Sequence, residues 1–184
     1  MATKPKLPLK FLAAIVGLLV VVIVVLYAPQ TERVSECISR TETVTVRGQS
    51  MEPLLEEGQE VRALYGYYDC NDVSRGDIVL FSYTGSETPL IKRVRALPDD
   101  TFALVESNGA WNILVNNEIL KNSAGAPYAL DNNAARLLQL YEHDYNGTVP
   151  ENAYMLLGEF PEGSTDSTRF GLVDKSGILA LVDV

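Results

Sequence analysis

The pattern of hydrophobic and polar positions divides the chain into an apolar N-terminal segment and a body of short alternating runs. Residues 11–27 read FLAAIVGLLVVVIVVLY and contain no charged side chain. As a helix this segment would measure about 26 Å, close to the ~30 Å hydrocarbon core of a bilayer. From residue 41 onwards, β-branched and aromatic residues alternate with polar ones between Gly, Pro, Asn and Asp, a pattern typical of β-strands.

The strand pattern recurs through most of the body and is interrupted by one helical pattern. Strands are predicted at 43–46, 60–65, 77–83, 90–97, 102–106, 112–115, 154–157 and 178–182, with a loop at 67–74. Ser107-Asn108-Gly109 predicts a hairpin turn and Asn116-Asn117 the next turn. A helix is predicted over 131–143, capped by Asp131, with Ala134, Leu137, Leu138 and Tyr141 on one face. We expect a mostly β, antiparallel sheet or barrel-like domain with one short helix.

The charges that flank the apolar segment predict a membrane anchor and its orientation. Lys4, Lys6 and Lys10 precede it without an intervening acid, which favours an N-terminus in the cytoplasm and a body outside. A cleavable signal peptide is the alternative. Against it, the apolar run is longer than the usual hydrophobic region of a signal peptide, and Tyr27-Ala28-Pro29 lacks a small-x-small cleavage site. The predicted organisation is a cytoplasmic end at 1–10, a single-pass anchor at 11–27, a connector at 28–40 and a periplasmic domain at 41–184.

Composition removes several classes of function. A net charge of −9 argues against nucleic acid as a partner. Two cysteines and one histidine exclude a Cys/His metal cluster, and we expect neither a metal nor a cofactor. In an oxidising compartment Cys37 and Cys70 could form a disulfide, but the sequence leaves two unpaired thiols equally open.

Lys92 is a candidate general base. On a strand, Leu90, Lys92 and Val94 share one face, while Ile91, Arg93 and Arg95 share the other, more polar one. A lysine that works as a base near neutral pH must have its pKa lowered by about three units, and burial on an apolar face supplies that shift. A lone strand lysine more often has its stem on the sheet and its head in solvent. The presence of Ser50 favours the catalytic interpretation.

Ser50 is a candidate nucleophile. It lies between Gly48 and Pro53, where a predicted strand ends in a turn. A turn serine is ordinary, but a nucleophile also needs an exposed hydroxyl on a rigid corner with backbone amides nearby. The predicted strand that ends at residue 46 and the turn fixed by Pro53 together supply such a corner.

Three motifs in register make the chain resemble the type I signal peptidases, which use a Ser/Lys dyad. They are Ser50-Met51-Glu52-Pro53, the Arg-Gly-Asp-Ile-Val run at 75–79, and the Lys-Arg strand at 92–100, in which Asp99 stands where glycine is usual. The resemblance implies that Ser50 attacks the substrate and that Lys92 is the general base. It covers residues 48–173 and the position of the anchor.

The last motif of the family, within 158–171, is matched in part. The resemblance implies that Ser164 orients the lysine amine and that Asp166 supports this corner by ion pairing. Thr168 occupies the usual arginine position, so Arg93 becomes a candidate partner for Asp166. Gly48 stands where some members carry a serine oxyanion donor, which leaves the Ser50 amide and the backbone near Gly48 for that role.

The resemblance also implies a substrate and a location. The family cleaves signal-peptide-bearing preproteins after small-x-small sequences such as Ala-x-Ala, and the substrate would bind as an added strand. The expected walls are residues 51–54 and 77–80, with Met51, Pro53, Leu54, Asp77, Ile78 and Val79 as the named substrate contacts. We expect the outer side of the bacterial inner membrane, with lipid and preproteins as partners.

Other functions remain open from the sequence. Only residues 101–157 separate the lysine motif from the last motif, which makes this a compact member. Compact relatives include peptidases that mature pilins in conjugative transfer, the main alternative, and organelle-type peptidases. Self-cleaving repressors share the dyad, but the anchor and the missing DNA-binding segment count against them. A non-catalytic, membrane-anchored β module is the alternative of a different class.

Overall fold

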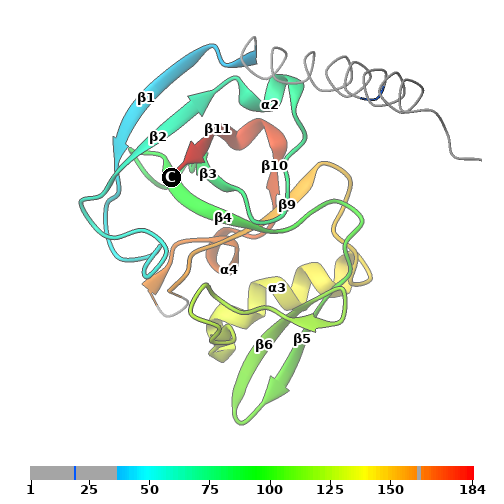
Figure 1. Cartoon of the computed structure of the whole chain (residues 1–184). Helices are drawn as coiled ribbons and strands as arrows, with labels where there is room; N and C mark the ends of the chain where they lie inside the picture. The colour runs from blue at the N-terminus through cyan, green and yellow to red at the C-terminus, as the bar shows by residue number, and fades with distance from the viewer. Residues whose placement is uncertain (1–18, 20–36, 161–162) are drawn as a thin grey trace, which may run out of the picture.

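Two antiparallel β-sheets form the body of the protein (Figure 1). The structure is a computed structural model, and it describes residues 19, 37–160 and 163–184. Within these residues, none of the helices combines the length and apolar character needed to cross a bilayer. The predicted anchor at 11–27 lies outside the described residues except for Leu19.

The larger sheet carries the strands that hold the candidate catalytic residues. In spatial order it consists of β1 (Arg40–Thr45), β2 (Glu60–Tyr65), β11 (Ile178–Asp183), β3 (Ile78–Phe81), β4 (Leu90–Ala96), β9 (Ala153–Leu157) and β10 (Val173–Asp174). Every neighbouring pair is antiparallel. The continuous apolar run of β3 is buried at every position, as expected for a central strand covered on both faces.

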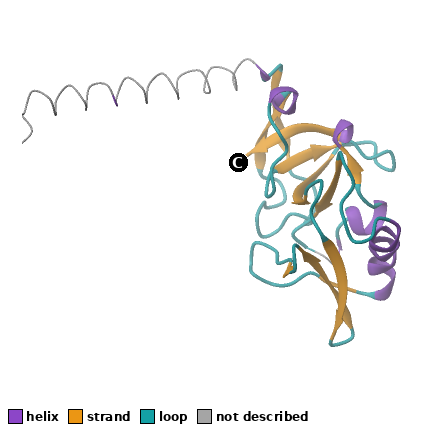
Figure 2. Cartoon of the chain, turned by 90° about the vertical axis from the view of Figure 1, so that its right-hand side faces the viewer, coloured by secondary structure: helices purple, strands orange, loops and turns teal. Residues whose placement is uncertain are grey.

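The smaller sheet extends away from the larger one and packs against the longest described helix (Figure 2). It contains β5 (Phe102–Ser107), β6 (Ala110–Val115), β7 (Glu118–Ile119) and β8 (Ala129–Leu130), with β8 paired to β6. The predicted hairpin is confirmed: Asn108 and Gly109 have φ of 54° and 79°, the positive values that a tight two-residue turn requires. Asn116 and Asn117 form the next turn in the same way.

The predicted helix is confirmed as α3 (Asn132–Asp144). The Asp131 carboxylate caps it by accepting from the N–H groups of Asn133 and Ala134. Ala135 and Leu138 are fully buried against the smaller sheet. The helix therefore closes a hydrophobic core that the smaller sheet shares with Ala96, Met155 and Leu157 of the larger sheet.

Several short elements differ from the prediction. The stretch expected as a loop at 67–74 contains α2 (Tyr67–Cys70), which follows Gly66 in the left-handed conformation. The helix α4 (Ser167–Phe170) and the 3₁₀ turn η2 (Lys175–Gly177) are also additional. The open question about the cysteines is resolved, because Cys37 and Cys70 form a disulfide that joins the residues before β1 to α2.

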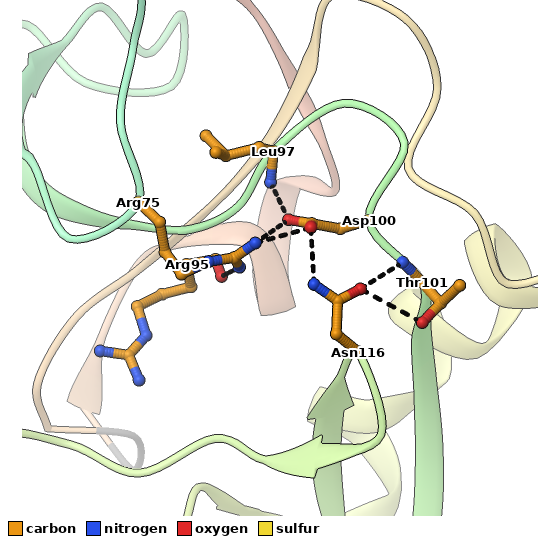
Figure 3. Close-up of polar contacts among 6 residues, drawn as sticks. All are labelled: Arg75, Arg95, Leu97, Asp100, Thr101 and Asn116. Atoms are coloured by element: carbon orange, nitrogen blue, oxygen red, sulfur yellow. Dashed lines mark hydrogen bonds and ion pairs between the residues drawn. The ribbon is translucent and has the colours of Figure 1, made fainter.

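The Arg75 and Asp100 motifs meet at the junction between the sheets (Figure 3). The Asp100 carboxylate accepts from the Arg75 guanidinium and the Leu97 N–H, each at 2.6 Å, and from the Asn116 amide at 2.8 Å. Burial raises the pKa of Asp100, but these donors outweigh it and hold the pKa below its usual value. The network ties the end of β4 to the turn after β6.

Asp100→Asn is expected to lower the free energy of unfolding by about 2–3 kcal/mol, because it leaves the half-buried Leu97 N–H without its charged acceptor. The half-exposed Arg75 pair contributes little of this loss. Since the pKa is lowered in the fold, the contribution of Asp100 is present above the pKa of an unfolded aspartate and disappears as the pH falls through the folded value.

Urea unfolding at pH 7 measures the loss, and Asp99→Asn is the matched control. Asp99 is exposed and has φ of 66°, which asparagine tolerates as well as aspartate does. Equal stability of the two variants would contradict a structural role for the Asp100 network.

Candidate active site

Ser50 lies in the turn between β1 and β2. Buried side chains of the turn itself and backbone hydrogen bonds from the residues after β9 fix its position. Met51 and Leu55 are each 1% exposed, and the Leu55 N–H donates to the Met51 carbonyl. The Ser50 carbonyl accepts from the N–H groups of Glu159 at 2.7 Å and Phe160 at 3.2 Å, just after β9. Two separate segments therefore hold the backbone of the candidate nucleophile.

The Lys92 side chain extends from β4 to the Ser50 hydroxyl. Its Nζ donates to Ser50 Oγ at 2.9 Å and to the Ile91 carbonyl at 2.8 Å. The residue is 3% exposed, and it pairs in register with the fully buried Val79. The prediction that the Lys92 amine is desolvated on its strand is thus confirmed, although Ile91 and Arg95 on the opposite, more polar face are buried as well.

The environment changes the proton affinity of the Lys92 amine. Burial lowers its pKa to about 8, against an opposing effect of the Asp166 carboxylate. A substantial fraction of the amine is therefore neutral in mildly alkaline solution. A neutral amine within hydrogen-bond distance of a hydroxyl can accept its proton, which is the geometry required to activate a serine.

Gly158 separates Ser50 from Ser164. A Cβ at position 158 would lie 2.3 Å from Ser164 Oγ and 2.6 Å from the Ser50 carbonyl oxygen, so no side chain fits. Ser164 is buried, and its hydroxyl has no hydrogen-bond partner within the described residues. The expected contact between Ser164 and the Lys92 amine is therefore not among the hydrogen bonds of this structure.

Asp166 is buried and acts as a local hydrogen-bond acceptor. Its carboxylate accepts from the Gly158 N–H at 2.9 Å, and from the Thr168 N–H and hydroxyl at 3.0 and 2.8 Å. It thereby caps α4 and fixes Gly158. The partner suggested for it, Arg93, instead forms an ion pair with Glu159 at 3.2 Å, because Glu159 follows the strand that pairs with β4.

Comparison with known proteins assigns the chain to a family. The model of the signal peptidase family, peptidase S26, matches residues 10–184. The chain belongs to this family. It is accordingly a serine peptidase.

Two relatives and one solved structure illustrate the similarity. Signal peptidase IB of Staphylococcus aureus (strain COL) is 27% identical over 143 residues, which cover 75% of this chain and 73% of the relative. Signal peptidase I of Bacillus caldolyticus is 30% identical over 141 residues, 75% of each chain. A crystal structure of a signal peptidase I from Enterococcus faecalis V583 is 20% identical, covers 61% of this chain and 98% of its own, and has a TM-score of 0.41.

The Ser50–Lys92 pair lines a cavity of about 460 Å³. Residues 42–47 form one wall and residues 88–92 another, and Ser50, Met51, Tyr65 and Leu80 complete the lining. Of the residues expected as walls, Met51 and Leu80 line this cavity, whereas Pro53, Leu54, Asp77, Ile78 and Val79 do not. Asp77 instead accepts from the Tyr68 hydroxyl and the Ser74 N–H.

Two backbone amides were expected to bind the oxyanion. The Ser50 N–H has no acceptor within the described part of the chain, so it can serve a ligand. The Gly48 N–H donates to the Glu57 carboxylate at 3.3 Å, a long bond that a substrate oxygen would have to replace.

Sequence reasoning assigned no role to Glu159, a fully buried residue whose N–H donates to the Ser50 carbonyl. Besides Arg93, its carboxylate accepts from the Ser123 N–H, and its carbonyl accepts from the Asn122 amide at 3.1 Å. The loop that follows β7 therefore reaches the segment that holds Ser50. The burial of Glu159 depends on long-range packing, which a single sequence does not reveal.

Gly158→Ala is expected to lower kcat at least about tenfold, because the added Cβ must displace either Ser164 or the backbone of Ser50. Steady-state cleavage of a peptide substrate measures the effect. Gly125→Ala is the control for the added methyl group: Gly125 has a positive φ, where alanine is strained, but no atom lies within 4 Å of an added Cβ. If the two variants cleave equally well, close packing at Gly158 is not needed for activity.

Proposed function

We propose that this protein is a membrane-bound signal peptidase that cleaves exported preproteins after small-x-small sites, with Ser50 as nucleophile and Lys92 as general base. The single observation that carries the proposal is the 2.9 Å contact between the buried Lys92 amine and the Ser50 hydroxyl. The names of the relatives, signal peptidase I and IB, support the substrate class.

The chemistry proceeds in two steps. Neutral Lys92 takes the proton of Ser50 Oγ as this oxygen attacks the carbonyl of the scissile peptide, and the Ser50 N–H stabilises the oxyanion. The protonated lysine then gives its proton to the leaving amine, which departs with the mature protein. Lys92, neutral again, activates a water molecule that hydrolyses the acyl-enzyme.

The apolar segment at 11–27 supports the membrane-bound part of the proposal. With the lysines before it in the cytoplasm, the catalytic domain lies on the outer side of the bacterial inner membrane. The apolar helix of a preprotein inserts in the same bilayer, which raises the effective concentration of the cleavage site at the enzyme.

Ser50→Ala and Lys92→Ala are each expected to lower the cleavage of an Ala-x-Ala preprotein by at least about a thousandfold, because each removes one partner of proton transfer. Ser107→Ala and Lys121→Ala, which remove exposed side chains, are the matched controls. Gel analysis of the processed preprotein measures cleavage, and circular dichroism checks the fold. Wild-type cleavage by either dyad variant would refute the mechanism, and a prepilin substrate cleaved in preference would favour the conjugative alternative.

The pH dependence of kcat/KM is expected to report the deprotonation of Lys92. Because the amine must be neutral and its pKa is about 8, activity should fall about tenfold per unit below that pH. A purified enzyme and a soluble peptide give this profile between pH 5 and 10. A rate that stays constant down to about pH 5 would contradict a lysine base.

A further inference from the structure

The outer edge of β1 is open towards the cavity. β1 is the terminal strand of the larger sheet and pairs only with β2 within the described residues. The Val46 N–H donates to the Gln59 carbonyl at 2.8 Å, and the Val46 carbonyl accepts from the Gly58 N–H at 2.9 Å. Since alternate residues of an antiparallel strand direct their peptide groups to opposite sides, those of Thr45 and Thr43 point away from β2.

The side chains of residues 43–47 alternate between the hydrophobic core and solvent. Val44 and Val46 pack into the buried cluster that also contains Met51, whereas Thr43, Thr45 and Arg47 are exposed. A substrate strand added at the open edge alternates in the same way. Its inward side chains meet the apolar floor, and its outward side chains lie beside the exposed residues of this segment.

This alternation indicates which side chains of a small-x-small substrate point towards the apolar floor and which point outwards. The assignment rests on the proposed function. The residue before the scissile bond, P1, must bring its carbonyl to Ser50, next to the buried Met51. P1 and P3, the small residues, then point inward, and P2 points outward. Arg47 is three residues before Ser50 and lines the same cavity, so it is the outward side chain of this wall nearest the nucleophile.

The charge of Arg47 is available to a ligand. The residue is exposed and forms no ion pair with any side chain in the described ranges. Glu42, the acid that lines the cavity, is paired with Arg40 at 3.2 Å, and Glu57 bonds the Gly48 N–H. Lys92 acts in its neutral form. Arg47 therefore supplies the unpaired charge of this wall.

We propose that Arg47 determines specificity at P2 and favours an acidic side chain between the two small residues. An exposed cross-strand ion pair changes kcat/KM by about two- to fivefold. The interaction exists equally before and during the reaction, so the change should occur in KM and not in kcat.

Three fluorogenic peptides test this inference if they differ only at P2, with Glu, Gln or Lys between two alanines. Wild-type enzyme should cleave them in the order Glu, Gln, Lys. Arg47→Gln should remove most of the difference, and Arg47→Glu should reverse the order. Sodium chloride at high concentration should weaken the preference, because it screens exposed charges. Arg136→Glu makes the same charge change on the exposed face of α3 and should preserve the wild-type order.

The outcomes separate this inference from the proposed function. Equal cleavage of the three peptides by wild-type enzyme, or the same order in Arg47→Glu, overturns the assignment of P2 and leaves the peptidase intact. If wild-type enzyme cleaves none of the peptides while it also fails on a full preprotein, the proposed function falls and the inference falls with it.

Discussion

The site depends on keeping one amine out of water while it remains within reach of a hydroxyl. A free lysine carries its proton far above neutral pH, and burial reverses this preference because water no longer stabilises the charge. Lys92 is 3% exposed, and Val79 beside it in the register is fully buried. The stability of the central strands therefore maintains the proton affinity on which the chemistry depends.

The geometry of the pair comes from segments distant in sequence. β4 supplies Lys92, the turn after β1 supplies Ser50, and the residues after β9 bond the Ser50 carbonyl through Glu159 and Phe160. The buried carboxylate of Glu159 is held in turn by Arg93 and by the Ser123 N–H from the loop that follows β7. This loop thus supports the catalytic corner without lining the cavity.

The local pattern of the sequence predicted most strands, the two Asn-containing turns and α3, because alternation, turn residues and caps act over a few positions. It also placed Ser50 and Lys92 through their motifs. It did not predict the partner of Arg93, since that contact depends on the register between β4 and β9. Of the wall expected at 77–80, Leu80 alone lines the cavity, and the contribution of β1 was missed because sheet order is not encoded in any single segment.

The contacts of Asp166 explain how its carboxylate is satisfied although Thr168 stands where the family motif has an arginine. Its carboxylate is fully occupied by the Gly158 N–H and by the backbone and hydroxyl of Thr168, so an arginine at 168 is not needed to satisfy it. The same carboxylate raises the pKa of Lys92 and so opposes the effect of burial. An acid that positions Gly158 therefore also limits how far the lysine can be deprotonated, and the depth of burial must compensate for that opposing charge.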